Sequence, residues 1–282
     1  NKKRLGNGSF RVEEYKKPEF EVTVKAPDKP VALGDKIQAR IEAKYYFGSP
    51  VVQAKVKYKV LRSQSTRAWY PKGTWDWCYD PGYWWFAYDY SWYPGWQRWA
   101  GCSRPSPWWW TPPAPPPEVV AQREVEIGPD GSITIEIDTA LAKALHGDQD
   151  HRYTITAEVV DSSRRTVVGS GQILATRQPF RVFTWVDRGY YRVGDVIQAN
   201  FLAQTPNRQP VSGSGRVTLL KIHYDEQQHP VETAVQSWLL NADSMGRAHL
   251  QIDASAAGQY RLSCELTDAD EHTMEGAYLF TV

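Results

Sequence analysis

Cysteine is scarce in this sequence, and long apolar runs are missing. Three cysteines occur in 282 residues, and so low a count leaves the redox compartment open. No apolar stretch approaches the roughly twenty residues that a membrane-spanning helix needs, and the opening NKKRLGNGSF lacks the apolar region of a signal peptide. We therefore expect no transmembrane segment, and a chain that begins inside a larger protein or as a mature segment.

An excess of one charge and the common catalytic motifs are also missing. The 33 basic and 32 acidic residues leave a net charge of +1, which predicts no electrostatic attraction to nucleic acid. There is no Gly-x-Ser-x-Gly elbow, no phosphate loop with lysine, no His-Glu-x-x-His and no Cys-x-x-Cys. The sequence thus predicts neither an enzyme nor a cofactor site.

Two polar stretches contain residue types that bind metals. His223 and His229 flank two acidic residues in HYDEQQH, and Asp268–Glu271 is rich in carboxylates. The histidines are six residues apart in a hairpin-like segment, and the acidic run lacks the glycine and distal glutamate of a calcium loop. We interpret both as solvated turns and predict no metal site.

The sequence does contain an internal repeat. Residues 20–51 match residues 180–211 at a constant offset of 160, with Gly-Asp, Ile-Gln-Ala and Pro-Val in corresponding places. The second half of the unit recurs at a spacing of 107, where YTITAEVVD at 153–161 matches YRLSCELTD at 260–268. Two copies of one domain follow, and the first copy carries about fifty extra residues.

Alternation of apolar and polar residues predicts β-strands almost everywhere. In Val52–Val60 every second residue is apolar, which is typical of a strand with one buried face. Only residues 139–145 (TALAKAL) predict a short helix, with Asp138 as its cap. Further alternating runs lie at 20–24, 37–43, 119–127, 132–137, 152–160 and 166–175 in the first copy, and near residues 180, 196, 215, 231, 247, 259 and 273 in the second.

About seven short strands per hundred residues predict the fold class. This density, with turn signals between strands and little helix, indicates tandem seven-stranded antiparallel β-sandwiches of immunoglobulin or fibronectin type. The boundary between them falls near residues 176–178 with almost no linker, so we expect rigid end-to-end packing. Such an all-β array is a scaffold, and its fold alone says little about function.

Most of the excess in the first copy is one aromatic segment. Between Trp69 and Trp110, eighteen of forty-two residues are aromatic, including eleven of the 13 tryptophans. The rings could stack against sugars or partner side chains, fold back on their own or a neighbouring sandwich, or remain disordered. We favour folding back, because so many exposed rings would promote aggregation. The ligand-binding candidates are Trp84, Trp85, Trp92, Trp108, Trp109 and Trp110.

The cysteines divide into two groups. Cys78 and Cys102 both lie in the aromatic segment, where a disulfide between them is possible. Cys264 shares a strand face with Tyr260 and Leu262, and its counterpart in the first copy is Ala157. We therefore expect Cys264 to be a buried, unpaired thiol.

Several motifs resemble the alpha-2-macroglobulin family. The opening GSFRVEEYKKPEFEVTV resembles the passage from one macroglobulin domain into the next, and YYFGSPVVQAKVKYKV resembles the Tyr/Phe-Gly-x-Pro-Val segment of the third macroglobulin domain. Gly-Asp-x-Ile, then Pro-Val, then a closing strand near Gly258-Gln259-Tyr260 is similar to macroglobulin domains in general. The resemblance covers nearly the whole chain except residues 69–117.

The resemblance implies a domain plan and a role. Residues 1–14 would end a preceding domain, residues 15–177 would form the third macroglobulin domain with its insertion at 62–117, and residues 178–282 would form the fourth. Family members trap proteases, since cleavage of a bait segment triggers a rearrangement and, in many, a thioester captures the attacker. Few cysteines favour a bacterial relative that is periplasmic, at the cell surface or secreted.

The thioester of that family needs a cysteine followed three residues later by glutamine. Pro81, Pro105 and Thr267 stand at those positions here, so a reactive site, if present, lies outside this segment. The first hypothesis is thus a structural module of a protease trap, with neighbouring macroglobulin domains and, through the full-length protein, target proteases as partners. The alternative is a surface adhesion or carbohydrate-binding protein that uses the Trp-rich insertion as its ligand platform.

Overall fold

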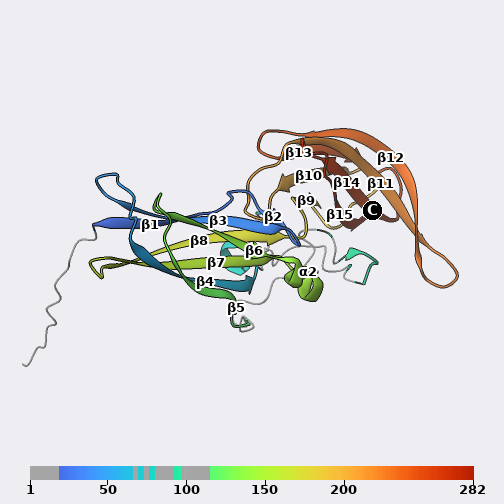
Figure 1. Cartoon of the computed structure of the whole chain (residues 1–282). Helices are drawn as coiled ribbons and strands as arrows, with labels where there is room; N and C mark the ends of the chain where they lie inside the picture. The colour runs from blue at the N-terminus through green and yellow to red at the C-terminus, as the bar shows by residue number, and fades with distance from the viewer. Residues whose placement is uncertain are drawn as a thin grey trace, which may run out of the picture.

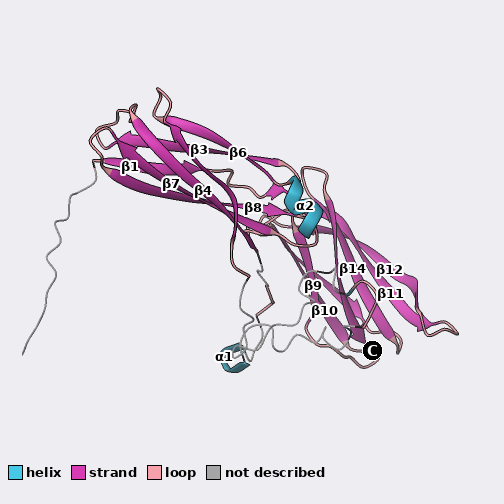
Figure 2. Cartoon of the chain, turned by 60° about the horizontal axis from the view of Figure 1, so that its bottom comes forward, coloured by secondary structure: helices cyan, strands magenta, loops and turns pink. Residues whose placement is uncertain are grey.

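The chain forms two β-sandwiches that meet at a short link (Figures 1 and 2). The structure is a computed structural model and describes residues 19–65, 69–72, 76–79, 90, 92–96, 99 and 115–282. Almost all regular structure in these residues is β-strand. The all-β fold class expected from the alternating runs is therefore confirmed.

The first sandwich contains a sheet in the order β1-β3-β6 and a second sheet in the order β2-β8-β7-β4-β5. All pairings are antiparallel except that of β2 with β8. Its strands are β1 (Phe20–Lys25), β2 (Val31–Ala32), β3 (Lys36–Tyr45), β4 (Ala54–Gln64), β5 (Glu118–Glu126), β6 (Ser132–Asp138), β7 (His151–Asp161) and β8 (Thr166–Thr176). Because β4 continues to Gln64 and β5 begins at Glu118, the long connection occupies residues 65–117.

The second sandwich is built from the sheets β13-β10-β9 and β12-β11-β14-β15. Every strand pairing within these two sheets is antiparallel. Its strands are β9 (Arg181–Val186), β10 (Val196–Gln204), β11 (Gly213–Tyr224), β12 (Pro230–Ala242), β13 (Arg247–Asp253), β14 (Gln259–Thr267) and β15 (Thr273–Thr281).

Each sandwich has its own hydrophobic core. Burial alternates along the strands, most regularly in β7, where every second residue from His151 to Asp161 is buried. Phe20, Ile41 and Ile155 are fully buried in the first core, and Phe180 and Leu262 in the second. Full burial of one such apolar side chain contributes about 1.5–3 kcal/mol, so the alternating pattern is the main source of each fold.

The repeat seen in the sequence is also a repeat of hydrogen bonds. The backbone N–H of Ala43 donates to the carbonyl of Gly131 at 2.8 Å, and that of Ala203 donates to Gly246 at 2.7 Å. Both glycines have positive φ, 73° and 70°, which a residue without Cβ adopts at little cost. The two sandwiches thus share this backbone hydrogen bond at corresponding positions.

Two short helices interrupt the strands. Helix α2 (Ala140–His146) is the predicted one, although its N-cap residue is Thr139, and Asp138 accepts a hydrogen bond from the Ala140 N–H at 2.8 Å. Helix α1 (Asp76–Tyr79) lies in the long connection and was not predicted. At four residues it forms a single turn, too short to show a helical repeat.

Asp150 joins the two sandwiches close to the link. Its buried carboxylate accepts the backbone N–H of Arg177 at 3.0 Å and also bonds the Arg181 guanidinium at the start of β9. A buried carboxylate that is held by two arginines fixes the direction in which the second sandwich leaves the first.

Candidate functional site

Two neighbouring strands of the second sandwich are buried on both faces. In β15 the five residues Gly276–Phe280 are all buried, and in β9 so are Val182–Thr184. Tyr278 and Phe280 face the core, whereas Ala277 and Leu279 pair with Ser263 and Arg261 on the outer face. Something must therefore cover the outside of this sandwich.

That cover is supplied by the long connection of the first sandwich. We give the name aromatic strap to six of its described aromatic residues: Trp69, Tyr90, Trp92, Tyr93, Trp96 and Trp99. Tyr93, Trp96 and Trp99 are buried and belong to the same hydrophobic cluster as Ala277 and Leu279. For these residues, the interpretation that the segment folds back on a neighbouring sandwich agrees with the structure.

Trp69 covers the outer face of β9. Its ring lies 4.7 Å from the ring of Phe183 and 5.5 Å from that of Trp185, centroid to centroid. Both partners are on the face of β9 opposite Val182, which belongs to the core. Further along the strap, the Tyr90 hydroxyl lies 2.7 Å from the Thr281 hydroxyl on β15.

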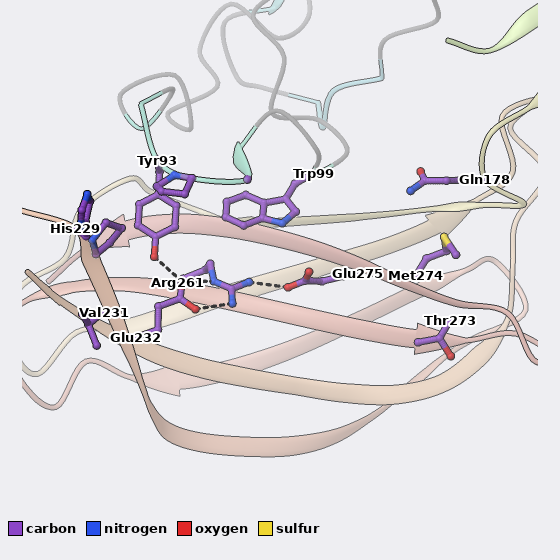
Figure 3. Close-up of a pocket in the computed structure, with 13 residues that line it drawn as sticks. Tyr93, Trp99, Gln178, His229, Val231, Glu232, Arg261, Thr273, Met274 and Glu275 are labelled. Carbon is purple, nitrogen blue, oxygen red and sulfur yellow. Dashed lines mark hydrogen bonds and ion pairs between the residues drawn. The ribbon is translucent and has the colours of Figure 1, made fainter. Parts of the chain in front are cut away.

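An arginine at the centre of the outer face holds the strap to three strands (Figure 3). Arg261 on β14 donates from Nε and Nη2 to the two carboxylate oxygens of Glu232 on β12, at 2.6 and 2.7 Å. Its Nη1 donates to Glu275 on β15 at 2.6 Å. Trp99 lies over the guanidinium, with its ring centroid 5.3 Å from Cζ, and the Tyr93 hydroxyl donates to Glu232.

The pKa values of this cluster favour its charged form. Burial alone would lower the pKa of Arg261, but hydrogen bonds from Arg261 to Glu232 and Glu275 raise it above its ordinary value. Burial pushes the pKa of Glu232 up, yet hydrogen bonds from Arg261 and Tyr93 bring it below the usual range. Burial and the bond to Glu232 raise the pKa of Tyr93, so this hydroxyl stays a donor. The fork geometry of arginine with a carboxylate is a strong, directional contact.

A groove of about 930 Å³ runs along the outer face beside the strap. Figure 3 shows Tyr93 and Trp99 on one side of it, with Arg261 and Glu275 on the strands below. The charged groups at its floor are already paired with one another. Its described lining residues pack the strap against the sheet through ring contacts and the charged cluster of Arg261.

Only one of the predicted ligand-binding tryptophans can be placed. Trp92 is 55% exposed, and its ring centroid lies 6.2 Å from that of Tyr224 on β11. Trp84, Trp85, Trp108, Trp109 and Trp110 lie outside the described residues. The rings that the structure buries are others, which the sequence did not single out.

The cysteines are placed as follows. Cys264 is buried and unpaired, as predicted, and burial raises its pKa to about 12. Cys78 is exposed on α1 and forms no disulfide with another described residue. Cys102 lies outside the described residues, so a disulfide between it and Cys78 stays a prediction.

The two polar stretches are hairpin turns, as predicted. Asp268, Asp270 and His272 each bring one potential ligand atom within 4.8 Å of the others. However, Asp268 Oδ1 already accepts the backbone N–H groups of Asp270 and His272, at 3.0 and 2.8 Å, and so closes the β14–β15 turn. Asp225 closes the β11–β12 turn in the same way.

Arg261, Glu232, Tyr93 and Trp99 were missed by the sequence reasoning. A signal for their site does exist in the strands that they cover. RVFTWV in β9 and GAYLFT in β15 contain neighbouring apolar residues where a half-buried strand would alternate, and such runs indicate a strand covered on both faces.

Within the described residues, no helix is both long and apolar enough to cross a bilayer.

Comparisons with known proteins give the following matches. The family model of the macroglobulin domain MG3 matches residues 14–74. An alpha-2-macroglobulin homolog of Nostoc sp. (strain PCC 7120) is 37% identical over 67 residues, which are 24% of this chain and 3% of that protein.

Among solved structures, Salmonella alpha-2-macroglobulin reacted with methylamine aligns with 97% of this chain and 17% of its own, at 10% identity and a TM-score of 0.43. The native conformation of E. coli alpha-2-macroglobulin aligns with 99% of this chain and 17% of its own, also at 10% identity and a TM-score of 0.43. The chain thus spans less than a fifth of the length of these proteins.

Proposed function

We propose that this chain, a macroglobulin-domain segment of an alpha-2-macroglobulin-like protein, is a scaffold in a protease trap whose bait and thioester, if present, lie outside it. In this role none of its residues reacts with the protease. Its direct partners are neighbouring macroglobulin domains of the same chain, and proteases are targets of the whole protein. We expect it to act in the periplasm, at the cell surface or after secretion.

The observation that carries this proposal is the aromatic strap, which connects the two sandwiches a second time. The strap belongs to the connection between β4 and β5 of the first sandwich, yet it packs on β9, β14 and β15 of the second. Bending at the link would pull its rings out of their contacts. Because full burial of one large apolar side chain is worth about 1.5–3 kcal/mol, several such rings oppose bending strongly.

A scaffold of this kind suits a protein that works by rearrangement. When a bait is cut, the displacement of one domain must reach others, and a flexible pair would absorb it. Two sandwiches that are fixed by Asp150 at the link and by the strap on the outer face move as one body. The segment would then transmit the movement without changing shape itself.

Protease capture by the intact natural protein tests the role. The protein is incubated with a protease that cuts it, and retention of the protease is measured by size-exclusion chromatography under native conditions. Intact mass before and after methylamine shows whether a thioester is present. A cut protein that retains no protease would refute the trapping role.

The contribution of the strap is tested with a matched pair of variants. Trp99 is buried, so Trp99→Ala should lower the free energy of unfolding of the second sandwich by about 3–5 kcal/mol. Leu239 lies on β12 outside the strap and is 86% exposed, so Leu239→Ala should change it by less than about 0.5 kcal/mol. In the intact protein, Trp99→Ala should reduce protease retention while leaving the rate of cutting unchanged. Equal retention by the two variants would show that the strap does not serve the trap.

A further inference from the structure

The turn between β3 and β4 ends in an exposed aromatic pair. Tyr46 is 59% exposed and Phe47 is 77% exposed. Phe47 stacks on Tyr45, with ring centroids 5.1 Å apart and ring planes 9° from parallel. Tyr45 pairs with Phe20 at the start of β1, and that end of the first sandwich points away from the second (Figures 1 and 2). We call residues 45–49 the aromatic tip.

The aromatic tip has a structural counterpart in the second sandwich. Residues 205–209 lie 160 positions further on, at the offset of the repeat. In the tip, the N–H of Tyr45 donates to the carbonyl of Ser49 at 2.9 Å, and the N–H of Thr205 donates to Gln209 at the same distance. Both turns are followed by an equivalent antiparallel bridge, at Pro50 and at Pro210. The two turns are therefore the same element in two copies.

In the second copy this element sits at the junction with the preceding sandwich. The Asn207 side chain donates from Nδ2 to the carbonyl oxygen of Asp28, at 3.2 Å, in the loop between β1 and β2. A groove of about 810 Å³ lies between the two parts, lined by Asp28, Lys29 and Pro30 on one side and by Thr205, Asn207 and Gln209 on the other. The turn is thus a contact point between consecutive domains.

We infer that the aromatic tip is the docking surface for another β-sandwich, which would offer the loop that corresponds to Asp28–Pro30. This inference rests on the proposed role as one segment of a domain array. Phe47 occupies the position of Asn207, so the repeat places it against the neighbour's loop. The partner is then a sandwich of the same type, seated head to tail as the second sandwich is seated on the first.

The residue types of the two turns predict a difference between the two junctions. Asn207 makes a polar contact and leaves a groove beside it. Tyr46 and Phe47 present flat apolar faces instead, and the free energy of binding is most favourable when such faces are removed from water. A neighbour that covers them needs an apolar or proline-bearing loop, and it would form a drier contact than the junction seen here.

Oxidative footprinting of the intact natural protein tests this inference. Hydroxyl radicals modify side chains according to their exposure, and mass spectrometry of peptides gives the rate for each site. Leu239 is 86% exposed and Trp77 is 79% exposed, and they serve as controls after correction for intrinsic reactivity. Phe47 and Tyr46 should react at least tenfold more slowly than the controls. Rates equal to those of the controls would overturn the inference.

A variant and a dilution series identify what protects the aromatic tip. Phe47→Asp should raise the oxidation of Tyr46 to the level of an exposed tyrosine, and unchanged protection of Tyr46 would count against docking through this tip. Protection that disappears on dilution would mean that a second copy covers the tip, which would overturn the choice of partner. Footprinting does not depend on protease capture, so the trapping role can fail while the docking surface stands.

Discussion

Arg261 is the residue through which the attachment of the strap can be tested most sharply. Its guanidinium holds Glu232 on β12 and Glu275 on β15, and Trp99 of the strap lies over it. Arg261→Ala removes all of these contacts at once. It also leaves two carboxylates close together without their counter-charge, which hinders the return of the strap to the sheet.

The size of the effect follows from the burial of the three side chains. Removing one partner of a fully buried ion pair costs about 3–5 kcal/mol. Here the Arg261 side chain is 14% exposed, but those of Glu232 and Glu275 are 26% and 40% exposed, so water stabilises part of the uncovered charge. We therefore expect Arg261→Ala to lower the free energy of unfolding by about 2–3 kcal/mol. Arg261→Lys keeps the charge but cannot form both hydrogen bonds to Glu232, and it should lower the free energy of unfolding by about 1 kcal/mol.

Urea denaturation followed by tryptophan fluorescence measures these changes. Arg216→Ala is the matched control, because Arg216 lies on β11 and is exposed, so its loss should change stability by less than about 0.5 kcal/mol. Adding Glu232→Gln to Arg261→Ala removes an uncompensated charge and should recover part of the loss. If Arg261→Ala and Arg216→Ala have the same stability, the cluster does not hold the strap.

Three other predictions concern acidity, thiols and turns. The folded-state pKa of Glu232 is lowered, so the ionised Glu232 contributes to the free energy of unfolding. This contribution is fully present above the ordinary glutamate pKa of about 4.3 and is lost as pH falls through the lower folded-state pKa. Urea titrations at different pH should show that Glu232→Gln removes this part of the acid-dependent loss of stability. A thiol reagent should label Cys78 in the native chain and Cys264 only after unfolding, and intact mass measures the labelling. A disulfide between Cys78 and Cys102 would instead prevent labelling of Cys78 until the protein is reduced. Glu271 has a positive φ of 64° in the β14–β15 turn, so Glu271→Gly should raise the melting temperature through a gain of about 0.5–1 kcal/mol, and Asp270→Gly should not.

The fold could be predicted because its information is local. Strands with one buried face alternate, as in Ile37–Ala43 and Val52–Val60, and the repeat shows the unit twice. The helix at 140–146 also followed from its sequence, although Thr139 and not Asp138 is the N-cap. Helix α1 was missed because a single turn carries no periodicity. A strand or helix is predictable when enough consecutive residues show its periodicity, and a single turn does not.

The site could be predicted only in outline. Because so many exposed rings would promote aggregation, the composition indicated that the aromatic segment folds back, but it does not specify the surface on which the segment packs. The choice depends on β9 and β15, whose outer faces carry Phe183 and Leu279. Arg261 gave no signal, since an arginine that alternates with apolar residues is the normal outward residue of a strand. Its partners come from two other strands, β12 and β15, and from the strap, and these lie far apart in the sequence.

The position of the strap in the chain has a consequence during synthesis. Trp99 leaves the ribosome well before β15, which ends at Thr281. At usual translation rates the roughly 180 residues between them take about 10 to 40 s to make. For that time the rings have no outer face to cover, so the nascent chain carries exposed apolar surface of the kind that chaperones bind. Slow codons or heat stress in this interval would therefore lower the yield of folded protein more than the stability of the finished molecule suggests.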